Sequence, residues 1–278
     1  MPEGGPGLSS ATLERSTAAG AEVSDRATRR IHRVVLIGHE NDGSRDLLRA
    51  VTRRFPAVEF TVVLTEGLYH RHSLLGSVWR LLREASLLFV LRRSLDLIAY
   101  RLSADTMVAR CRQMGIPVIR TRDVNSAAAR RAIEAFHPDL IVLLYTMHLL
   151  NWRTIRIPRF GAIGSHPSIL PHYRGLEVFF WALANGEPET GVSVYFLRPK
   201  VDAGQVICQE RVLIAPDDSV RTLYRKVTAV AQRLLCEAIV RIDDGTARPY
   251  PVEGEGSYFP MPTREAYRRF QRSGRRWR

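Results

Sequence analysis

Short hydrophobic runs alternate with helical patterns along the first half of the chain. Continuous apolar runs at 33–38, 58–64 and 140–144 are typical of buried strands, and the segments between them repeat apolar residues at three- and four-residue spacing. Strands that alternate with helices predict an α/β fold: a mostly parallel, doubly wound sheet with helices on both faces. Such sheets bind ligands at the carboxyl ends of their strands, near the point where the strand order reverses. We therefore expect the functional site at that edge.

The second half of the chain predicts a different series of elements. They are a short strand and loop, a helix, an antiparallel strand pair and a long final helix, at 160–170, 175–186, 191–197 with 205–214, and 219–245. One domain is expected from residue 31 to residue 245. Residues 1–30 are rich in Gly, Ser, Thr and Ala and have no apolar segment typical of a signal peptide, so we interpret them as a disordered leader.

Residues 73–102 interrupt the alternation with a longer apolar and basic stretch. Its longest run without a charge, Ala85 to Leu91, is far shorter than the ~18 residues that a membrane-spanning helix needs. Apolar residues recur through it at helical spacing. We interpret it as an amphipathic helix or helix pair that packs on the domain or on a second subunit, which makes it a candidate homodimer interface. Lying on a membrane surface is the alternative.

Charge and cysteine content narrow the expected environment. The net charge is +13, and the last fifteen residues hold seven arginines against one glutamate. This predicts a basic C-terminal tail, 246–278, that is solvated, partly disordered and dispensable for chemistry; contact with nucleic acid, an anionic membrane or an acidic partner is the alternative. Cys111, Cys208 and Cys236 are odd in number and far apart, which argues against a disulfide framework or a zinc site. We expect a cytoplasmic protein without a metal.

A histidine lies where the chain should turn after the short strand of the second half. His166 precedes Pro167, which favours extended backbone, and Pro171 and Gly175 bracket a stiff turn. Asp202 lies in a glycine-containing loop between the two antiparallel strands. Loops at a strand edge can bring a histidine and a carboxylate together as an acid–base pair. Histidines and aspartates also flank turns for structural reasons, so spacing alone leaves both interpretations open.

Three segments together resemble the folate-dependent formyltransferase family. They read GAIGSHPSILPHYRG at 161–175, LANGEPETGVSVYFL at 183–197 and VDAGQVICQE at 201–210, in the family's order and spacing. The likeness runs from about Arg33 to Ile242 and is strongest from Pro138 to Gln209. It implies a Rossmann-like formyltransferase fold and a role in one-carbon metabolism. The implied reaction is formyl transfer from the co-substrate 10-formyltetrahydrofolate to an amine.

The resemblance also implies which residues form the site. His166 would contact the formyl oxygen and handle the amine proton, and Asp202 would orient its ring and favour the charged form. The segment 147–150 and the loop 198–204 would form the two walls of the pterin pocket. The folate-binding residues carried over are Met147, His148, Leu149, Leu150, Pro199, Lys200 and Val201. From the residues alone, we expect Gly43, Ser44 and Arg45 to open a helix whose N-terminus binds an anionic group of the acceptor; an ordinary helix capped by Ser44 is the alternative. Ser168 and Arg174 are the other expected acceptor-binding residues.

Gly164 departs from the family pattern, which has an asparagine there as a second donor to the formyl oxygen. Residues 164 and 166 share one face of the predicted strand and Ser165 points the other way, so Ser165 cannot replace the missing amide. Losing one such donor typically costs about 10²–10³ in rate. A water in the space beside Gly164, or a group such as Ser168, is expected to recover part of the loss.

The predicted function is formyl transfer to a small-molecule amine, such as an amino sugar nucleotide or a natural-product intermediate. Methionyl-tRNA formyltransferases fit less well because a sizeable barrel domain follows their catalytic domain, whereas about 35 residues follow Asp243 here. Nucleic acid is therefore not an expected partner. The segment DGSRDLL echoes glycinamide ribonucleotide transformylase only weakly. Two alternatives stay open: a 10-formyltetrahydrofolate hydrolase, and a non-catalytic scaffold that binds partners through its arginines.

Overall fold

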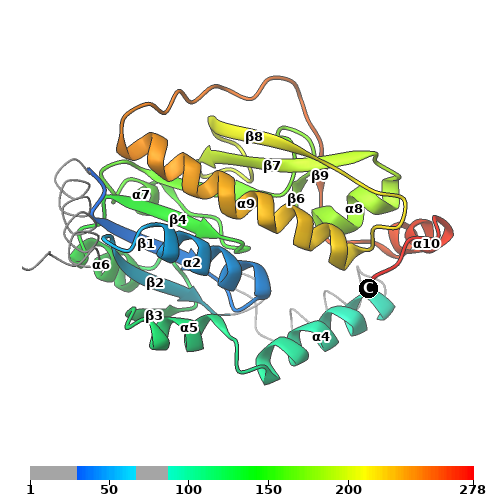
Figure 1. Cartoon of the computed structure of the whole chain (residues 1–278), viewed down its shortest axis with the longest axis horizontal. Helices are drawn as coiled ribbons and strands as arrows, with labels where there is room; N and C mark the ends of the chain where they lie inside the picture. The colour runs from blue at the N-terminus through cyan, green and yellow to red at the C-terminus, as the bar shows by residue number, and fades with distance from the viewer. Residues whose placement is uncertain (1–29, 67–86) are drawn as a thin grey trace, which may run out of the picture.

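A seven-stranded sheet forms the centre of the computed structural model, which describes residues 30–66 and 87–278 (Figure 1). The strand order is β3-β2-β1-β4-β5-β7-β8, in which β1 to β5 pair in parallel and β7 and β8 pair antiparallel. The strands are β1 Arg33–Gly38, β2 Glu59–Thr65, β3 Val118–Thr121, β4 Leu140–Leu144, β5 Ala162–His166, β7 Glu189–Phe196 and β8 Val206–Leu213. The order reverses between β1 and β4, so the predicted mostly parallel, doubly wound sheet is confirmed.

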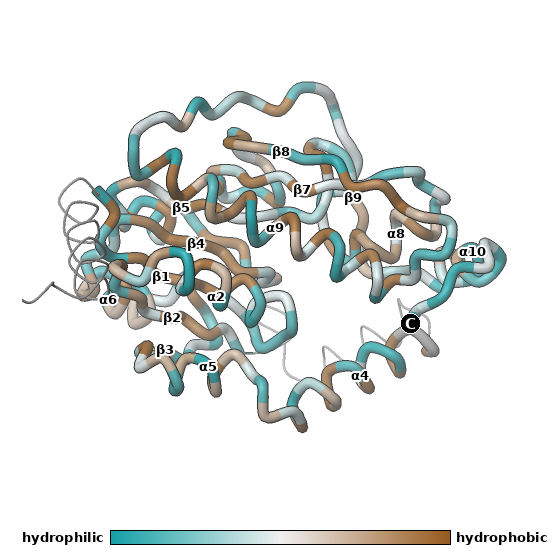
Figure 2. Tube along the Cα trace, viewed as in Figure 1, coloured by the Kyte–Doolittle hydropathy of each residue, from teal (hydrophilic) through white to brown (hydrophobic). Residues whose placement is uncertain are grey.

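Helices cover both faces because alternate residues of the central strands feed two separate apolar cores. Val34 and Leu36 of β1 belong to one core, and Val35 and Ile37 belong to the other. The helices of the first face are α2 Asp42–Arg54, α5 Met107–Gln113, α8 Val178–Asn185 and α9 Val220–Asp243; those of the second are α6 Ala127–Ala135 and α7 Trp152–Ile155. Figure 2 shows the resulting hydrophobic centre, with β1 and β4 in brown.

The long helix α9 begins at a capping box and is amphipathic. The Ser219 side chain accepts from the Thr222 backbone N–H, and the Thr222 hydroxyl accepts from the Ser219 backbone N–H. Its apolar positions, Leu223, Val227 and Ala231 among them, are fully buried against α2 and the antiparallel strands. The expected final helix of the domain is therefore present, and it ties the two halves of the sheet together.

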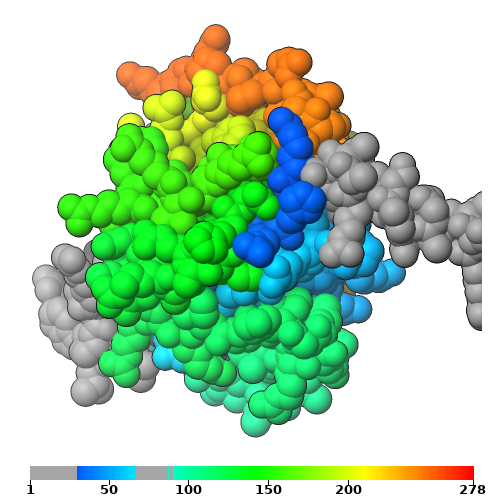
Figure 3. All heavy atoms as spheres, turned by 90° about the vertical axis from the view of Figure 1, so that its left-hand side faces the viewer, coloured from blue at the N-terminus to red at the C-terminus, as the bar shows by residue number. Residues whose placement is uncertain are grey.

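The residues after α9 are ordered parts of the fold, so the expectation of a solvated C-terminal tail is wrong. They cross β8, where Tyr250 bridges Val206, and Figure 3 shows this orange segment beside the yellow β8. They then form β9 Tyr258–Phe259, which pairs with β6 Arg174–Gly175, and α10 Arg264–Arg272, which packs on α8. Arginines dominate the sequence of α10, but apolar residues on one face of it are buried.

Only the second part of the predicted 73–102 insertion lies within the described residues. It forms the helix α4 Leu87–Leu102, which lies between α5 and α10 at one side of the molecule (Figure 1). The residues before 87 lie outside the described part of the chain, as does the predicted leader up to residue 29. Within the described ranges, no helix is both long enough and apolar enough to cross a membrane.

Candidate active site

His166 is the last residue of β5, and its ring is held between a backbone carbonyl and a carboxylate. Nε2 lies 2.7 Å from the Tyr173 carbonyl oxygen, and Nδ1 lies 3.4 Å from Oδ1 of Asp202. A carbonyl oxygen can only accept, so Nε2 must carry a hydrogen and donate it. The neutral ring then has its lone pair on Nδ1, facing the carboxylate across a gap longer than an ordinary hydrogen bond. The predicted His166–Asp202 pair is brought together by the fold.

Asp202 accepts hydrogen bonds from two groups other than His166. The Tyr195 hydroxyl donates to Oδ1 and the Gly175 backbone N–H donates to Oδ2, both at 2.8 Å. Burial, followed by the neighbouring Asp202 charge, raises the pKa of Tyr195 well above its ordinary value, so the phenol stays a donor. The backbone of Asp202 itself lies in the left-handed region at φ 45°. Such a conformation in a residue other than glycine is costly and is common at functional sites.

Gly204 lets the Asp202 loop return against the sheet. A Cβ at Gly204 would lie 1.8 Å from the Phe196 carbonyl oxygen, so no side chain fits there. The close approach holds the 198–204 loop against the end of β7. The glycine two residues after Asp202 therefore allows the loop conformation that positions the carboxylate.

The turn that supplies the Tyr173 carbonyl is braced by the C-terminal segment. Arg174 N donates to the Ser257 carbonyl, Leu176 N donates to the Phe259 carbonyl, and Tyr173 stacks on Phe259 at 4.7 Å between ring centroids. Tyr173 has φ 56°, also in the left-handed region. Residues well beyond 245 thus hold the strained turn in which the histidine's acceptor lies.

Exposed apolar side chains lie in both segments that the sequence predicted as walls of a pterin pocket. Met147 and Leu149 follow β4 and are 39% and 48% exposed, and Val201 of the 198–204 loop is 39% exposed. Exposed apolar side chains of this kind suit a flat heterocycle. His148 and Leu150 alternate with them and are buried, so of the predicted folate-binding residues these two face the protein. Pro199 is half-buried and Lys200 is exposed.

The space beside Gly164 is partly filled by neighbouring side chains, whereas the sequence predicted an open void. A Cβ at Gly164 would lie 3.2 Å from Cδ2 of Leu197 and 3.4 Å from Cβ of Leu143. Leu197 is buried in the second apolar core, against which Leu143 also packs. A leucine thus lies against the position where the family's asparagine side chain would start, and a side chain added there needs Leu197 to shift.

The start of α2 is already occupied by protein contacts. Asn41, not Ser44, is the N-cap, and its side chain accepts from Ser44 N at 2.8 Å. A Cβ at Gly43 would lie 2.3 Å from the Tyr145 ring. Ion pairs join Arg45 to three carboxylates, those of Asp42, Asp46 and Asp105. Burial lowers the pKa of Arg45, but these carboxylates outweigh it and raise the pKa above its ordinary value. The surroundings of Arg45 therefore do not favour an added anion.

The other two predicted acceptor residues also have roles within the loop. Ser168 is buried, and its hydroxyl donates to the His172 carbonyl at 2.6 Å. Arg174 lies in β6, and its Nη2 donates to the Glu255 carbonyl at 3.3 Å. Within 30–66 and 87–278, no group of three or more His, Cys, Asp or Glu side chains could hold a metal ion.

The sequence reasoning missed three partners of the pair. Tyr195, Tyr173 and Gly175 contribute a hydroxyl, a carbonyl and a backbone N–H. The Tyr-Arg-Gly run after His166 was visible, but its backbone conformation was not. Tyr195 pairs with Gly164 across β5 and β7, so the strand register could have placed it on the site face.

Comparisons with known proteins indicate the family to which this chain belongs. A sequence model described as Formyl transferase matches residues 96–239. The methionyl-tRNA formyltransferase of Kosmotoga olearia is 33% identical over 155 residues, which cover 55% of this chain and 50% of that protein. The chain thus spans about half the length of the curated relatives it matches.

Solved structures share the fold at low sequence identity. A sugar N-formyltransferase from Shewanella sp FDAARGOS_354 gives a TM-score of 0.58 at 15% identity, covering 87% of each chain. An N-formyltransferase from Helicobacter canadensis, in complex with folinic acid and dTDP-3-aminofucose, gives 0.55 at 18% identity, covering 84% of this chain and 71% of that one. The sequence match spans more than half of the chain, and the sheet has the expected architecture. The chain therefore belongs to the formyl transferase family.

Proposed function

We propose that the protein transfers a formyl group from 10-formyltetrahydrofolate to the amine of a small-molecule acceptor. The observation that carries this proposal is the His166–Asp202 pair at the carboxyl edge of the sheet, with Nε2 engaged by the Tyr173 carbonyl. Family membership supports the reaction class. Because the matched relatives are about twice as long as the matched segment, the activity of the whole protein is part of the proposal.

The ring tautomer gives His166 a defined part in the reaction. With the hydrogen of Nε2 committed to Tyr173, Nδ1 is the nitrogen that takes the proton from the attacking amine. Asp202 stabilises the resulting charge, and its own position is held by Tyr195 and Gly175. The loose 3.4 Å contact between Nδ1 and Asp202 leaves this nitrogen the least committed polar atom of the pair. Protonated Nδ1 can then donate to the oxygen on which negative charge develops, and its proton is available to the tetrahydrofolate nitrogen that leaves as its bond to the formyl carbon breaks.

The residues present fit a folate at this edge. Folate would supply the activated formyl group when bound. Met147, Leu149 and Val201 would cover the faces of its pterin ring, since they are apolar and exposed. Leu150 and His148 would support the wall from behind. Gly164 and Leu197 would border the formyl group, and the apolar Leu197 would keep free water away from it.

An amino sugar nucleotide is the acceptor that the fold relatives support. One solved structure of this fold is a sugar N-formyltransferase, and another is an N-formyltransferase in complex with folinic acid and dTDP-3-aminofucose. The curated relatives, in contrast, are methionyl-tRNA formyltransferases. We favour the small acceptor because the site lies at the strand ends beside an exposed apolar wall, the arrangement usual for small-molecule pockets.

A turnover assay with an acceptor panel tests this proposal. The full chain is incubated with 10-formyltetrahydrofolate and one of dTDP-3-aminofucose, glycinamide ribonucleotide or methionyl-tRNA, and tetrahydrofolate release is followed. The corresponding hydroxyl sugar nucleotide is the matched control. We expect release and a formylated product with the amino sugar alone. Equal release of tetrahydrofolate without any amine would identify a hydrolase. Release with methionyl-tRNA alone would identify a tRNA formyltransferase. No release with any of them would favour a non-catalytic scaffold.

A further inference from the structure

One face of α4 presents an uninterrupted apolar stripe to solvent. Five side chains spaced four, four, three and four residues apart make up the stripe, and they are 52–82% exposed. They are Leu87, Leu91, Leu95, Ile98 and Leu102. This spacing places all five on one side of a helix. Single exposed leucines are ordinary, but an aligned row of five marks an interaction surface.

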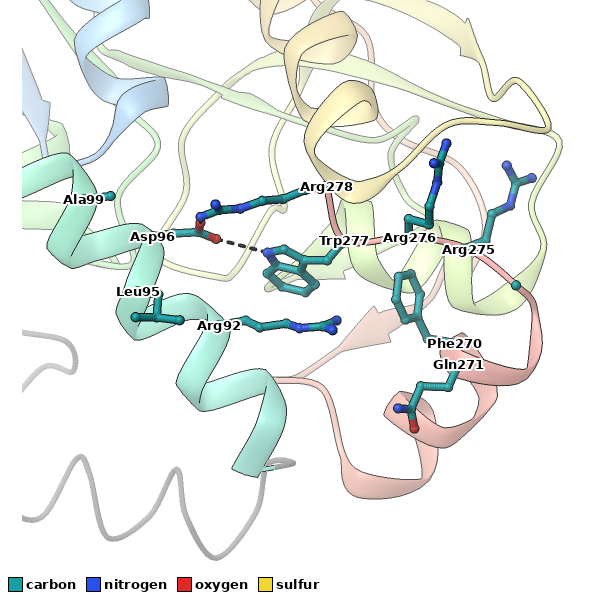
Figure 4. Close-up of a pocket in the computed structure, with 11 residues that line it drawn as sticks. Arg92, Leu95, Asp96, Ala99, Phe270, Gln271, Arg275, Arg276, Trp277 and Arg278 are labelled. Atoms are coloured by element: carbon teal, nitrogen blue, oxygen red, sulfur yellow. Dashed lines mark hydrogen bonds and ion pairs between the residues drawn. The ribbon is translucent and has the colours of Figure 1, made fainter.

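The opposite face of α4 is fixed to the protein, so the stripe has a definite direction. The Tyr100 hydroxyl donates to Oε2 of Glu40 at 2.6 Å, and Arg93 pairs with Glu177 at 2.9 Å. The Trp277 ring Nε1 donates to Asp96 at 3.0 Å, as drawn in Figure 4. Three contacts along the length of α4 thus hold its inner side, and the apolar stripe faces outward.

Arginines border the stripe. A cleft of about 800 Å³ separates α4 from the C-terminal segment, and Leu95 of the stripe lines it together with Arg92, Arg276 and Arg278 (Figure 4). His166 and Asp202 do not line this cleft. The side chains of α10 and the last residues add more exposed positive charge. The exposed arginines there are Arg264, Arg268, Arg269, Arg272, Arg276 and Arg278. The segment 264–278 has seven arginines and one glutamate.

We propose that the stripe and the arginines of 264–278 together form a docking surface for an anionic lipid bilayer. A helix that lies in the membrane interface needs an apolar face to enter the acyl boundary and basic residues to meet acidic headgroups. Both are present side by side here, on elements held together by the Trp277–Asp96 contact. The net charge of +13 adds long-range attraction to an anionic surface. The helix lies on the membrane and does not cross it, in keeping with its 16 residues.

The same features fit other occupants less well. A nucleic acid would use the arginines but gain nothing from five exposed aliphatic side chains, because phosphate contacts are electrostatic. A symmetric dimer through α4 would bury the leucines but bring two sets of C-terminal arginines towards one another across the two-fold axis. Of these three occupants, an anionic bilayer is the one that complements both the apolar stripe and the arginines.

Vesicle flotation of the full chain tests the proposal. The expected result is binding to vesicles of phosphatidylcholine mixed with phosphatidylglycerol, weak binding to phosphatidylcholine alone, and loss of binding at high salt. A variant with Leu91→Gln, Leu95→Gln and Ile98→Gln should bind at least about tenfold more weakly, since each buried aliphatic side chain contributes strongly to the transfer. Leu213→Gln, which changes a leucine that is 75% exposed on β8, is the matched control and should bind normally.

A second variant separates the charge from the apolar face. Arg268→Gln, Arg272→Gln and Arg276→Gln together should also weaken binding to the mixed vesicles, by about fivefold for each arginine lost. Exposed arginines of α2 and α6, changed by Arg53→Gln and Arg131→Gln, are the control and should have little effect. Circular dichroism and thermal melting confirm that each variant is folded.

Three results would overturn the proposal. One is no flotation of the wild type with mixed vesicles. Another is flotation that the leucine variant leaves unchanged, together with tRNA binding that the arginine variant abolishes, which identifies a nucleic-acid surface. The third is a wild-type dimer in sedimentation that the leucine variant dissociates, without vesicle binding, which identifies a second copy as the occupant.

Discussion

His166 shows how far a motif predicts chemistry and where backbone conformation takes over. The sequence predicted the histidine and Asp202, because both lie in segments that resemble a known pattern. It did not predict that Nε2 would be engaged by the Tyr173 carbonyl, because that contact depends on a left-handed backbone at Tyr173. A positive φ at a tyrosine cannot be predicted from the sequence, because glycine is the residue that commonly indicates such a backbone conformation. The proposal that Nδ1 is the reacting nitrogen therefore rests on the structure and not on the sequence.

Tyr195→Phe should lower kcat without changing the fold. The substitution removes the hydroxyl that donates to Asp202 at 2.8 Å, and hydrogen bonds to charged groups contribute enough that about a tenfold loss of kcat is expected. The KM for folate should change little, because Tyr195 does not line the apolar walls. Tyr250→Phe, which removes a hydroxyl that donates to Gln209, is the control. An unchanged kcat in folded Tyr195→Phe would show that Asp202 does not need this donor.

Gly164→Asn should lower the hydrolysis that occurs without an acceptor, and keep or raise transfer to the amine. The amide restores a donor worth about 10²–10³ in rate, but Leu197 must shift to admit it. Gly164→Ala adds the crowding without the amide and is the matched control. Both rates are compared between the two variants, alongside the folate dissociation constant. Hydrolysis by Gly164→Asn as fast as by the wild type, with normal folate binding, would contradict this.

Helices and strands were predictable where buried residues recur at a regular spacing. They were not predictable where burial depends on a segment far away in the sequence. The apolar runs of β1, β2 and β4 and the spacing within α9 predicted those elements because each buries a regular face. β9 is two residues long and exists only by pairing with β6, so no pattern marks it. In α10 the arginines hid Ala266, Tyr267 and Phe270, whose helical spacing was the signal for a packed helix.

Phe270→Ala should destabilise the whole domain although it lies in the basic C-terminal segment. Phe270 is 1% exposed and packs on Phe180 at 5.0 Å between centroids. Loss of a buried phenylalanine typically costs about 3–5 kcal/mol in the free energy of unfolding. Gln271→Ala, its exposed neighbour, should change little. Denaturant unfolding measures the free energy of unfolding of both variants. Equal stability of the two would support the hypothesis of a solvated tail.

Deleting 264–278 should also lower the free energy of unfolding of the domain. Val220 N and Arg221 N at the start of α9 donate to the carbonyls of Arg276 and Trp277 at 3.0 and 3.1 Å. The deletion removes these partners and three buried aromatic residues, Tyr267, Phe270 and Trp277. A truncated chain with the stability of the full one would show that these contacts are not needed.

At the scale of the whole molecule, buried tyrosines link stability to alkaline pH. Burial, followed by the hydrogen bond to Glu187, raises the pKa of Tyr173 to about 12, and burial also raises the pKa values of Tyr195 and Tyr224. A folded-state pKa above the unfolded one gives stability that is complete below the unfolded value and is lost as pH rises through the folded one. The free energy of unfolding should therefore fall above about pH 10.

Urea unfolding across that range checks the sign. The unfolding midpoint should be level from about pH 8 to the tyrosine range and then decline, and Tyr173→Phe should make the decline shallower. Arg53→Gln supplies a control for general alkaline effects, since it removes an exposed charge and no phenol. A midpoint that rises with pH, or a slope that Tyr173→Phe leaves unchanged, would contradict the assignment.

The most direct measurement is the turnover of 10-formyltetrahydrofolate, with the acceptor amine present, by wild type, His166→Ala, Asp202→Asn and the double variant. In the proposed mechanism Asp202 acts through the histidine ring, 3.4 Å away, so the two residues form one unit. Each single substitution should lower kcat by orders of magnitude, and the double variant should be little worse than either. Near-normal turnover by folded His166→Ala, or losses that simply multiply in the double variant, would contradict the account.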